Sequence, residues 1–131
     1  MLDINYFKEY FSDNPIGFIL TKRNNTEDID LFINKIDSFI FNVRNEISTS
    51  QFKKIYSEVR RLSPADIAKI KLIRIQLAYI AGRNEKSNAT QKLCSLIDSL
   101  IQNLNADNLN EFRIFLEAII AYHKYHNPKA K

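Results

Sequence analysis

The sequence contains few of the residues that interrupt helices, with only two glycines and three prolines in 131 residues. All-β proteins consist of many short strands joined by turns, and those turns depend on glycine and proline. Their scarcity excludes an all-β fold and favours helices. No uncharged apolar run approaches the roughly 18 residues of a membrane span, so the sequence predicts no transmembrane helix.

Cysteine is nearly absent as well, because Cys94 is the only one in the chain. A single cysteine cannot form an internal disulfide or a thiolate zinc cluster. The N-terminal residues also lack the basic flank and apolar run of a secretory signal. We therefore expect a cytoplasmic protein.

Sequence signatures of catalysis are missing too. The chain has no Gly-rich phosphate loop, no G-x-S-x-G nucleophile elbow and no H-E-x-x-H motif. His123 and His126 lie three residues apart, but no strong set of further metal ligands lies near them, and cations are also favoured at a helix C-terminus. We therefore predict a protein that is not an enzyme, with no catalytic residue, no metal and no cofactor.

What the chain does have is a basic middle third. The formal net charge is +4, and it is distributed unevenly. Residues 1–47 contain five basic and eight acidic side chains, whereas residues 48–92 contain ten basic and three acidic ones. Such a concentration of charge indicates an anionic partner that binds the middle of the chain.

Apolar residues recur at the three-and-four spacing of buried helical faces, which predicts six helices joined by short loops. An irregular stretch from Asn14 to Asn25 follows the first helix. We expect its apolar residues Phe18, Ile19 and Leu20 to pack onto the body of the protein and act as an apolar clip. The predicted helices are Tyr6–Phe11, about Glu27–Arg44, Ser48–Leu62 with a Ser48/Gln51 capping box, Ser63–Gly82 with Ser63 as cap, about Thr90–Leu104, and Asn108 to near Pro128 with Asn108 and Glu111 as cap. We expect an all-α fold, a compact antiparallel bundle of five or six helices.

The basic residues are spaced to form rows on the predicted helix surfaces. Lys53 and Arg60 lie seven apart, as do Lys54 and Arg61, and both rows flank an apolar face. Arginine and lysine are suited to phosphate oxygens, and no motif for reading base edges is present. The sequence therefore predicts RNA-backbone binding that does not read sequence and depends strongly on salt. The candidate RNA-binding residues are Lys53, Lys54, Arg60, Arg61, Lys71, Arg74 and Arg83.

Two other functions fit the same features. A helical protein–protein adaptor would use the basic face to bind an acidic protein. A free-standing nucleic-acid-binding regulator would use the short Leu62-Ser63-Pro64 junction as part of a helix-turn-helix. The predicted fourth helix is apolar over much of its length, which is typical of a core element.

Three segments resemble the small helical subunit of type III-A CRISPR effector (Csm) complexes. They are Thr49-Ser50-Gln51-Phe52-Lys53-Lys54 with Val59-Arg60-Arg61, then Lys71-Leu72-Ile73-Arg74 with Tyr79-Ile80-Ala81-Gly82-Arg83, and finally the run from Phe112 to Tyr125. The likeness covers a family-like core over residues 48–126 and does not extend to variable N-terminal helices over residues 1–47. We expect both parts to form one helical domain over residues 1–131.

The resemblance implies a function in antiviral defence. Family members stack as several copies beside guide RNA and its bound target RNA, and they contact RNA backbone, other effector subunits and one another. Nuclease chemistry belongs to other subunits. Carried over residue by residue, the resemblance implies RNA contacts at Lys53, Lys54, Arg60, Arg74 and Arg83, with Lys71 and Arg61 beside them.

Overall fold

The computed structural model describes residues 2–129, and within that range it contains helices and no strand. The helices are α1 (Ile4–Lys8), α2 (Pro15–Leu20), α3 (Thr26–Val43), α4 (Ser50–Arg61), the 3₁₀ helix η1 (Pro64–Asp66), α5 (Ile67–Lys71), α6 (Ile73–Arg83), α7 (Asn88–Gln102) and α8 (Leu109–His126). The predicted all-α bundle is confirmed. None of these helices combines the length and hydropathy that a bilayer crossing requires.

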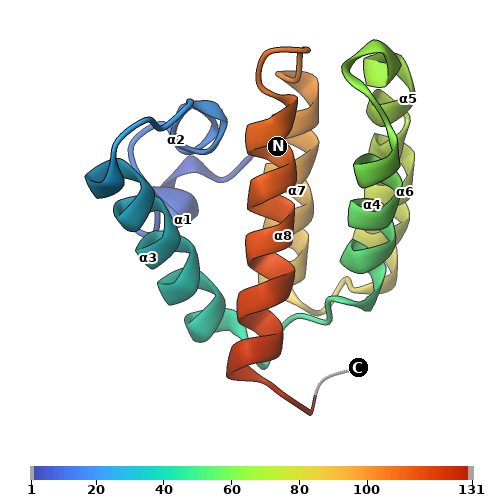
Figure 1. Ribbon diagram of the computed structural model, residues 1–131. Coiled ribbons are helices and arrows are strands. Elements are labelled where there is room, and N and C mark those ends of the chain that lie inside the picture. The colour runs from blue at the N-terminus through green and yellow to red at the C-terminus, as the bar shows by residue number, and fades with distance from the viewer. Residues whose placement is uncertain (1, 130–131) are drawn as a thin grey trace.

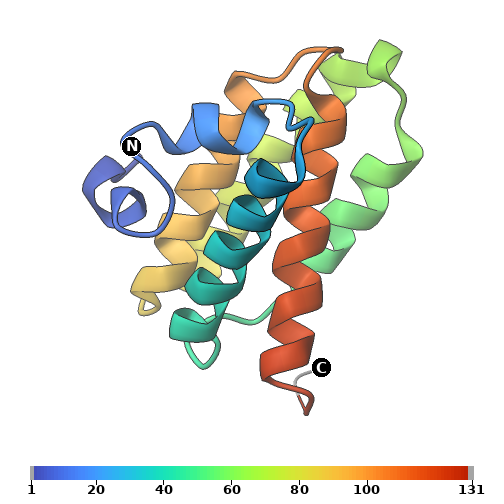
Figure 2. The same ribbon diagram turned by 60° about the vertical axis from the view of Figure 1, so that its left-hand side comes forward.

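The helices form three groups side by side (Figure 1). Helices α7 and α8 occupy the middle, α1–α3 lie on one side, and α4–α6 lie on the other. Consecutive long helices run antiparallel, as short loops require. Helices α3 and α8 also pack together, but they run in the same direction (Figure 2). Because these two are far apart in the chain, no short loop dictates their relative direction.

The hydrophobic core is one continuous cluster centred on α7. Leu93, Leu96, Ile97, Leu100 and Ile101 are fully buried, because α7 is covered by its neighbours over most of its circumference. A helix that is apolar over so much of its surface belongs in the middle of a bundle. The five buried side chains thus explain why α4–α6 and α1–α3 pack on opposite sides of the central pair.

The N-terminal region is more helical than the sequence predicted. The prediction of an irregular stretch is wrong for Pro15–Leu20, which forms α2. Asn14 caps this helix by accepting a hydrogen bond from Gly17 N at 3.0 Å, and Pro15 suits its first position. Phe18 and Ile19 pack onto the core, as expected of an apolar clip.

Two predicted helix caps are wrong. Thr49, not Ser48, precedes α4, and it is buried with its hydroxyl 3.4 Å from His123 Nδ1. Asn108 does not cap α8, because its Oδ1 accepts from the Asn105 amide and its Nδ2 donates to the Asn103 carbonyl. A tertiary contact of the neighbouring residue thus displaces the Ser48 cap, whose hydroxyl lies 3.2 Å from Ser50 Oγ, and loop contacts occupy the Asn108 side chain.

The predicted fourth helix is divided in the structure. Ser63 and Asp66 form a capping box on η1, as expected, and Asp66 accepts from Ser63 N at 2.9 Å. The chain then passes through α5 and breaks at Leu72 before α6 begins. Ile70 and Ile73 are both buried, so the chain keeps the same face toward the core across the break, where the amides of Leu72 and Ile75 bond to carbonyls three residues earlier.

Gly82 does not end its helix, because α6 continues to Arg83 and no glycine in the structure has a positive φ. A Cβ at Gly82 would meet nothing within 4 Å. We therefore expect Gly82→Ala to raise the free energy of unfolding by about 0.5–1 kcal/mol in urea denaturation. Gly17→Ala should do the opposite, because its Cβ would lie 2.9 Å from Asn14 Cγ, and equal effects of the two substitutions would contradict this interpretation.

Candidate nucleic-acid interface

Helix α4 presents four basic side chains to solvent because its other face is anchored in the core. Phe52, Ile55 and Val59 are buried at the three-and-four spacing of one helical face. Of the four cations of α4, Lys54, Arg60 and Arg61 are exposed and Lys53 is half-buried. They form what we call the α4 basic face: Lys53, Lys54, Arg60 and Arg61.

The edge of this face that carries Arg60 borders α8. Tyr56 lies on this edge, and its hydroxyl donates a hydrogen bond to Glu117 Oε2 on α8 at 2.7 Å. That bond to a carboxylate holds the phenol proton and raises the pKa of Tyr56. The Arg60 guanidinium carbon lies 5.7 Å from the centroid of the Tyr56 ring. Tyr56 therefore links the Arg60 side chain to α8.

Arg113 on α8 fixes the other end of α4. Its guanidinium donates to the carbonyl of Val59, at 3.2 and 3.3 Å, and to the carbonyl of Leu62. These are carbonyls that the end of a helix leaves without a partner. The sequence assigned no such role to Arg113, and no local pattern reveals it, because the acceptors lie more than 50 residues earlier in the chain.

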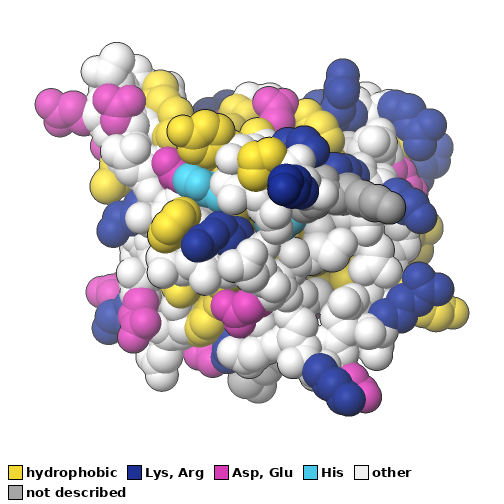
Figure 3. Space-filling model, turned by 90° about the horizontal axis from the view of Figure 1, so that it is seen from below, with side chains coloured by type: hydrophobic (Ala, Val, Ile, Leu, Met, Phe, Trp, Pro, Cys, Tyr) yellow, Lys and Arg dark blue, Asp and Glu magenta, His cyan; other side chains and the backbone are white. Residues whose placement is uncertain are grey.

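The positive charge of the α4 basic face is not neutralised within the part of the chain that the structure describes. Lys53, Lys54 and Arg61 form no ion pair there. Glu58, the only acidic residue of α4, accepts instead from Gln76 Nε2 at 3.0 Å. Seen from below, Lys and Arg side chains gather on the side of the molecule formed by α4–α6, at the right of Figure 3. This side presents cations that are free to meet an anionic partner.

Arg83 lies at the same end of the molecule as the start of α4. The Asn84 side chain, next to it, donates to Gln51 Oε1 at 3.3 Å, which brings the end of α6 against the first turn of α4. Asn84 also donates to Ile80 O at 2.7 Å and so helps to satisfy the last carbonyls of α6. Arg83 itself is exposed and makes no hydrogen bond or ion pair with residues 2–129. It therefore extends the α4 basic face onto α6.

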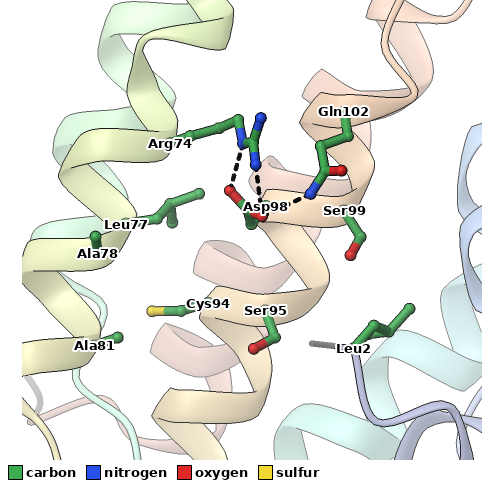
Figure 4. Close-up of a pocket in the computed structure, with 10 residues that line it drawn as sticks. All are labelled: Leu2, Arg74, Leu77, Ala78, Ala81, Cys94, Ser95, Asp98, Ser99 and Gln102. Atoms are coloured by element: carbon green, nitrogen blue, oxygen red, sulfur yellow. Dashed lines mark hydrogen bonds and ion pairs between the residues drawn. The ribbon is translucent and has the colours of Figure 1, made fainter.

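Lys71 and Arg74 point away from this face, toward α7. Arg74 pairs with Asp98 through Nε–Oδ1 at 2.7 Å and Nη2–Oδ2 at 3.5 Å (Figure 4). Lys71 Nζ donates to the carbonyls of Ile101 and Gln102, at 3.0 and 3.3 Å, at the end of α7. The structure thus groups Lys53, Lys54, Arg60, Arg61 and Arg83, and it places Lys71 and Arg74 in contacts between helices.

A cavity of about 320 Å³ lies between α6 and α7 below the Arg74–Asp98 pair. Ala78, Ala81 and Ser95 contribute small side chains to its walls, and Cys94 lies at its edge. No cluster of three or more His, Cys, Asp and Glu side chains able to hold a metal occurs among residues 2–129.

Cys94 should react very slowly with thiol reagents in the native protein. It is buried, and burial raises the pKa of its thiol to about 12. Because the thiolate is the reacting species, we expect modification at about pH 8 to be roughly a thousandfold slower than that of free cysteine. Absorbance of a released thiolate reporter measures the rate, with denatured protein as the fast control. A native rate equal to the denatured rate would contradict the buried position.

The two histidines serve separate structural contacts. His123 is buried, and its Nε2 lies 3.1 Å from the carbonyl oxygens of both Arg44 and Ile47, in the segment between α3 and α4. His126 Nε2 contacts Asp37 on α3. These contacts hold the C-terminal part of α8 against α3 and against the segment that follows α3.

Comparison with known protein families identifies a relationship that covers most of the chain. A family model described as Csm2 Type III-A matches residues 26–129, from the first turn of α3 to beyond the end of α8. No curated protein and no solved structure matches the chain. The matched range includes the whole α4 basic face and Arg83.

Proposed function

Since this chain belongs to the Csm2 Type III-A family, the small subunits of type III-A CRISPR complexes, we propose that it is a non-catalytic subunit that binds RNA backbone. The RNA strands in question are the guide and its target. This function places the protein in the cytoplasm, in antiviral defence, and in contact with other CRISPR effector subunits.

The observation that supports RNA binding is the un-neutralised α4 basic face, together with Arg83. Phosphate oxygens are bound well by arginine forks and lysine ammonium groups. Pairing between guide and target can supply sequence specificity, so a surface that recognises only charge and shape is sufficient. Lys53, Lys54, Arg60, Arg61 and Arg83 are the proposed contacts that need no rearrangement.

Lys71 and Arg74 are also proposed RNA contacts, but each would first have to leave its present partner on α7. To reach phosphate, Arg74 would exchange Asp98 for an RNA oxygen, and Lys71 would leave the α7 carbonyls. The loss of those contacts would offset part of the gain from the RNA contacts. RNA binding at these two positions is therefore proposed to be weaker than at α4.

Several copies are proposed to stack along one RNA. One copy with a few phosphate contacts should bind RNA with a dissociation constant on the order of 10⁻⁴ to 10⁻⁶ M at physiological salt. Neighbouring copies on one strand raise the effective concentration of each other. Useful affinity then arises from the assembly.

The test is titration of the purified protein with fluorescently labelled single-stranded and duplex RNA at several salt concentrations. We expect binding that does not depend on sequence, with log K falling linearly with log salt at a slope of about −0.7 per phosphate contact on single strands. Binding that is unaffected by salt would contradict a phosphate-contacting surface. Absence of binding at low salt, both alone and in a reconstituted complex, would favour the adaptor function.

A DNA-binding regulator is less consistent with the fold. After the Leu62-Ser63-Pro64 junction, the chain enters η1 and the five-residue helix α5, which is too short to serve as a recognition helix. Helix α6 then buries Ile73, Leu77 and Ile80 in the core.

A further inference from the structure

Helix α6 carries three large apolar side chains that lie open to solvent. Leu72, Ile75 and Tyr79 are 63%, 62% and 71% exposed, and together we call them the α6 row. Their spacing of three and four residues places them on one face of the helix. Tyr79 makes no ring contact or hydrogen bond within residues 2–129. Contiguous exposed apolar side chains of this kind mark an interaction surface.

The surface beside the α6 row is hollow and basic. Leu72, Ile75 and Ala78 line a shallow depression of about 520 Å³. Lys71, Arg74 and Asp98 also line this depression. Arg83 follows Tyr79 by one helical turn, and Lys86 lies just beyond the helix end beside Glu85, so cations outnumber carboxylates around the row. A partner that covers the α6 row must therefore combine apolar side chains with acidic ones.

Helix α3 offers that combination on the opposite side of the molecule. Ile29, Ile33, Asp37 and Phe41 follow one another at four-residue intervals, and we call them the α3 ridge. The three apolar members are 41%, 36% and 48% exposed. Beside the ridge, Glu27 and Asp30 are exposed and form no ion pair among residues 2–129.

We propose that the α6 row of one copy docks against the α3 ridge of the next copy, so that the copies join head to tail. This inference rests on the proposed stacking of several copies and names the two surfaces involved. The apolar side chains would leave water, and the basic rim of α6 would meet the acidic flank of α3. Because α3 and α6 lie on opposite sides of the molecule (Figures 1 and 2), the contact uses two different surfaces and leaves one of each free on a dimer, to which further copies can add.

A second copy fits the α6 row better than RNA does. Leu72 and Ile75 have no ring on which a base can stack and make no hydrogen bond to an RNA backbone, so Tyr79 is the one member of the row that could stack on a base. The acidic flank of α3, on the other side of the molecule, would repel RNA, so that surface also needs a partner other than RNA. Head-to-tail contact satisfies both surfaces and leaves Lys53, Lys54, Arg60 and Arg61 open to RNA, while Arg83 lies at the border between the two surfaces.

The test compares two double variants of the full chain by sedimentation, alone and mixed. Ile75→Asp/Tyr79→Asp blocks the α6 row, and Ile29→Lys/Asp30→Lys blocks the α3 ridge. All four positions are exposed, so both variants should fold, which circular dichroism can check. The wild type should form a series of oligomers as its concentration rises, and each variant alone should associate at least about tenfold more weakly.

Mixing the variants distinguishes head-to-tail contact from other arrangements. Each variant retains the face that the other lacks, so the mixture should form a 1:1 dimer and nothing longer. If the Ile29→Lys/Asp30→Lys variant associates like the wild type, two α6 rows meet each other and the proposal is wrong. A wild type that stays monomeric up to about 1 mM at low salt would also overturn it.

A short RNA that accommodates one copy separates this inference from the proposed function. Both variants retain the α4 basic face, so each should bind such an RNA with only the modest change in affinity that its altered net charge produces. If Ile75→Asp/Tyr79→Asp loses RNA binding while self-association persists, the α6 row belongs to the RNA surface and the inference fails. If no protein binds RNA but the head-to-tail pattern holds, the proposed RNA function fails and the inference stands.

Discussion

The Lys53→Ala/Lys54→Ala/Arg60→Ala variant is expected to bind single-stranded RNA about a hundredfold more weakly than the wild type at about 0.1 M salt. Each lost phosphate contact lowers the affinity about fivefold at that concentration, given a salt slope of about 0.7 per contact. The slope itself should fall by about two. Fluorescence anisotropy over a range of salt concentrations measures both quantities.

A matched control removes the same charge from the other side of the molecule. Lys8→Ala/Lys22→Ala/Lys35→Ala takes three lysines from the α1–α3 region, where we expect no RNA contact. Its affinity should fall only by the small amount that long-range attraction provides. Equal losses in both variants would show that net charge, and not the α4 basic face, determines binding.

Phe39→Ala is expected to lower the free energy of unfolding by about 3–5 kcal/mol. Phe39 on α3 is fully buried, and its ring meets those of Phe7 and Phe11, with centroids 5.7 and 5.4 Å apart. Tyr6 and Tyr10 pack against the same ring. Truncation would leave a cavity where α1 docks on α3. Urea denaturation followed by circular dichroism measures the change.

Phe41→Ala is the matched control for this substitution. Phe41 lies on the same helix, two residues later, and it is largely exposed, with contacts to Arg44 and His126 only at its ring. We expect a loss of no more than about 1 kcal/mol. If the two substitutions cost the same, the aromatic cluster does not hold α1 and α3 together.

The outward direction of the α4 residues followed from the sequence. The apolar period of Phe52, Ile55 and Val59 is local information, and it determines which side chains remain in solvent. The ion pair of Arg74 could not be predicted in this way, although its position on a helix surface was. Its partner Asp98 is 24 residues away, and only the packing of α6 on α7 brings the two together.

Helix ends also differ in whether local sequence or tertiary packing determines them. The Ser63–Asp66 capping box was predicted and confirmed, because both of its hydrogen bonds form within four residues. The Ser48 cap failed because Thr49 is drawn into the core toward His123, 74 residues later in the chain. Gly82 failed as a helix end because the α6–α7 contact provides a cap at Asn84 instead.

The sequence by itself therefore determined the fold class, the positions of the long helices and the basic character of α4, since these depend on periodicity and composition. The tertiary structure alone decided which cations stay free, how Arg113 anchors α4, and where apolar side chains remain uncovered. The physical reason is distance along the chain. Local patterns specify which face of a helix is buried, but only the packing of distant helices specifies which neighbour covers it and which charges that neighbour neutralises.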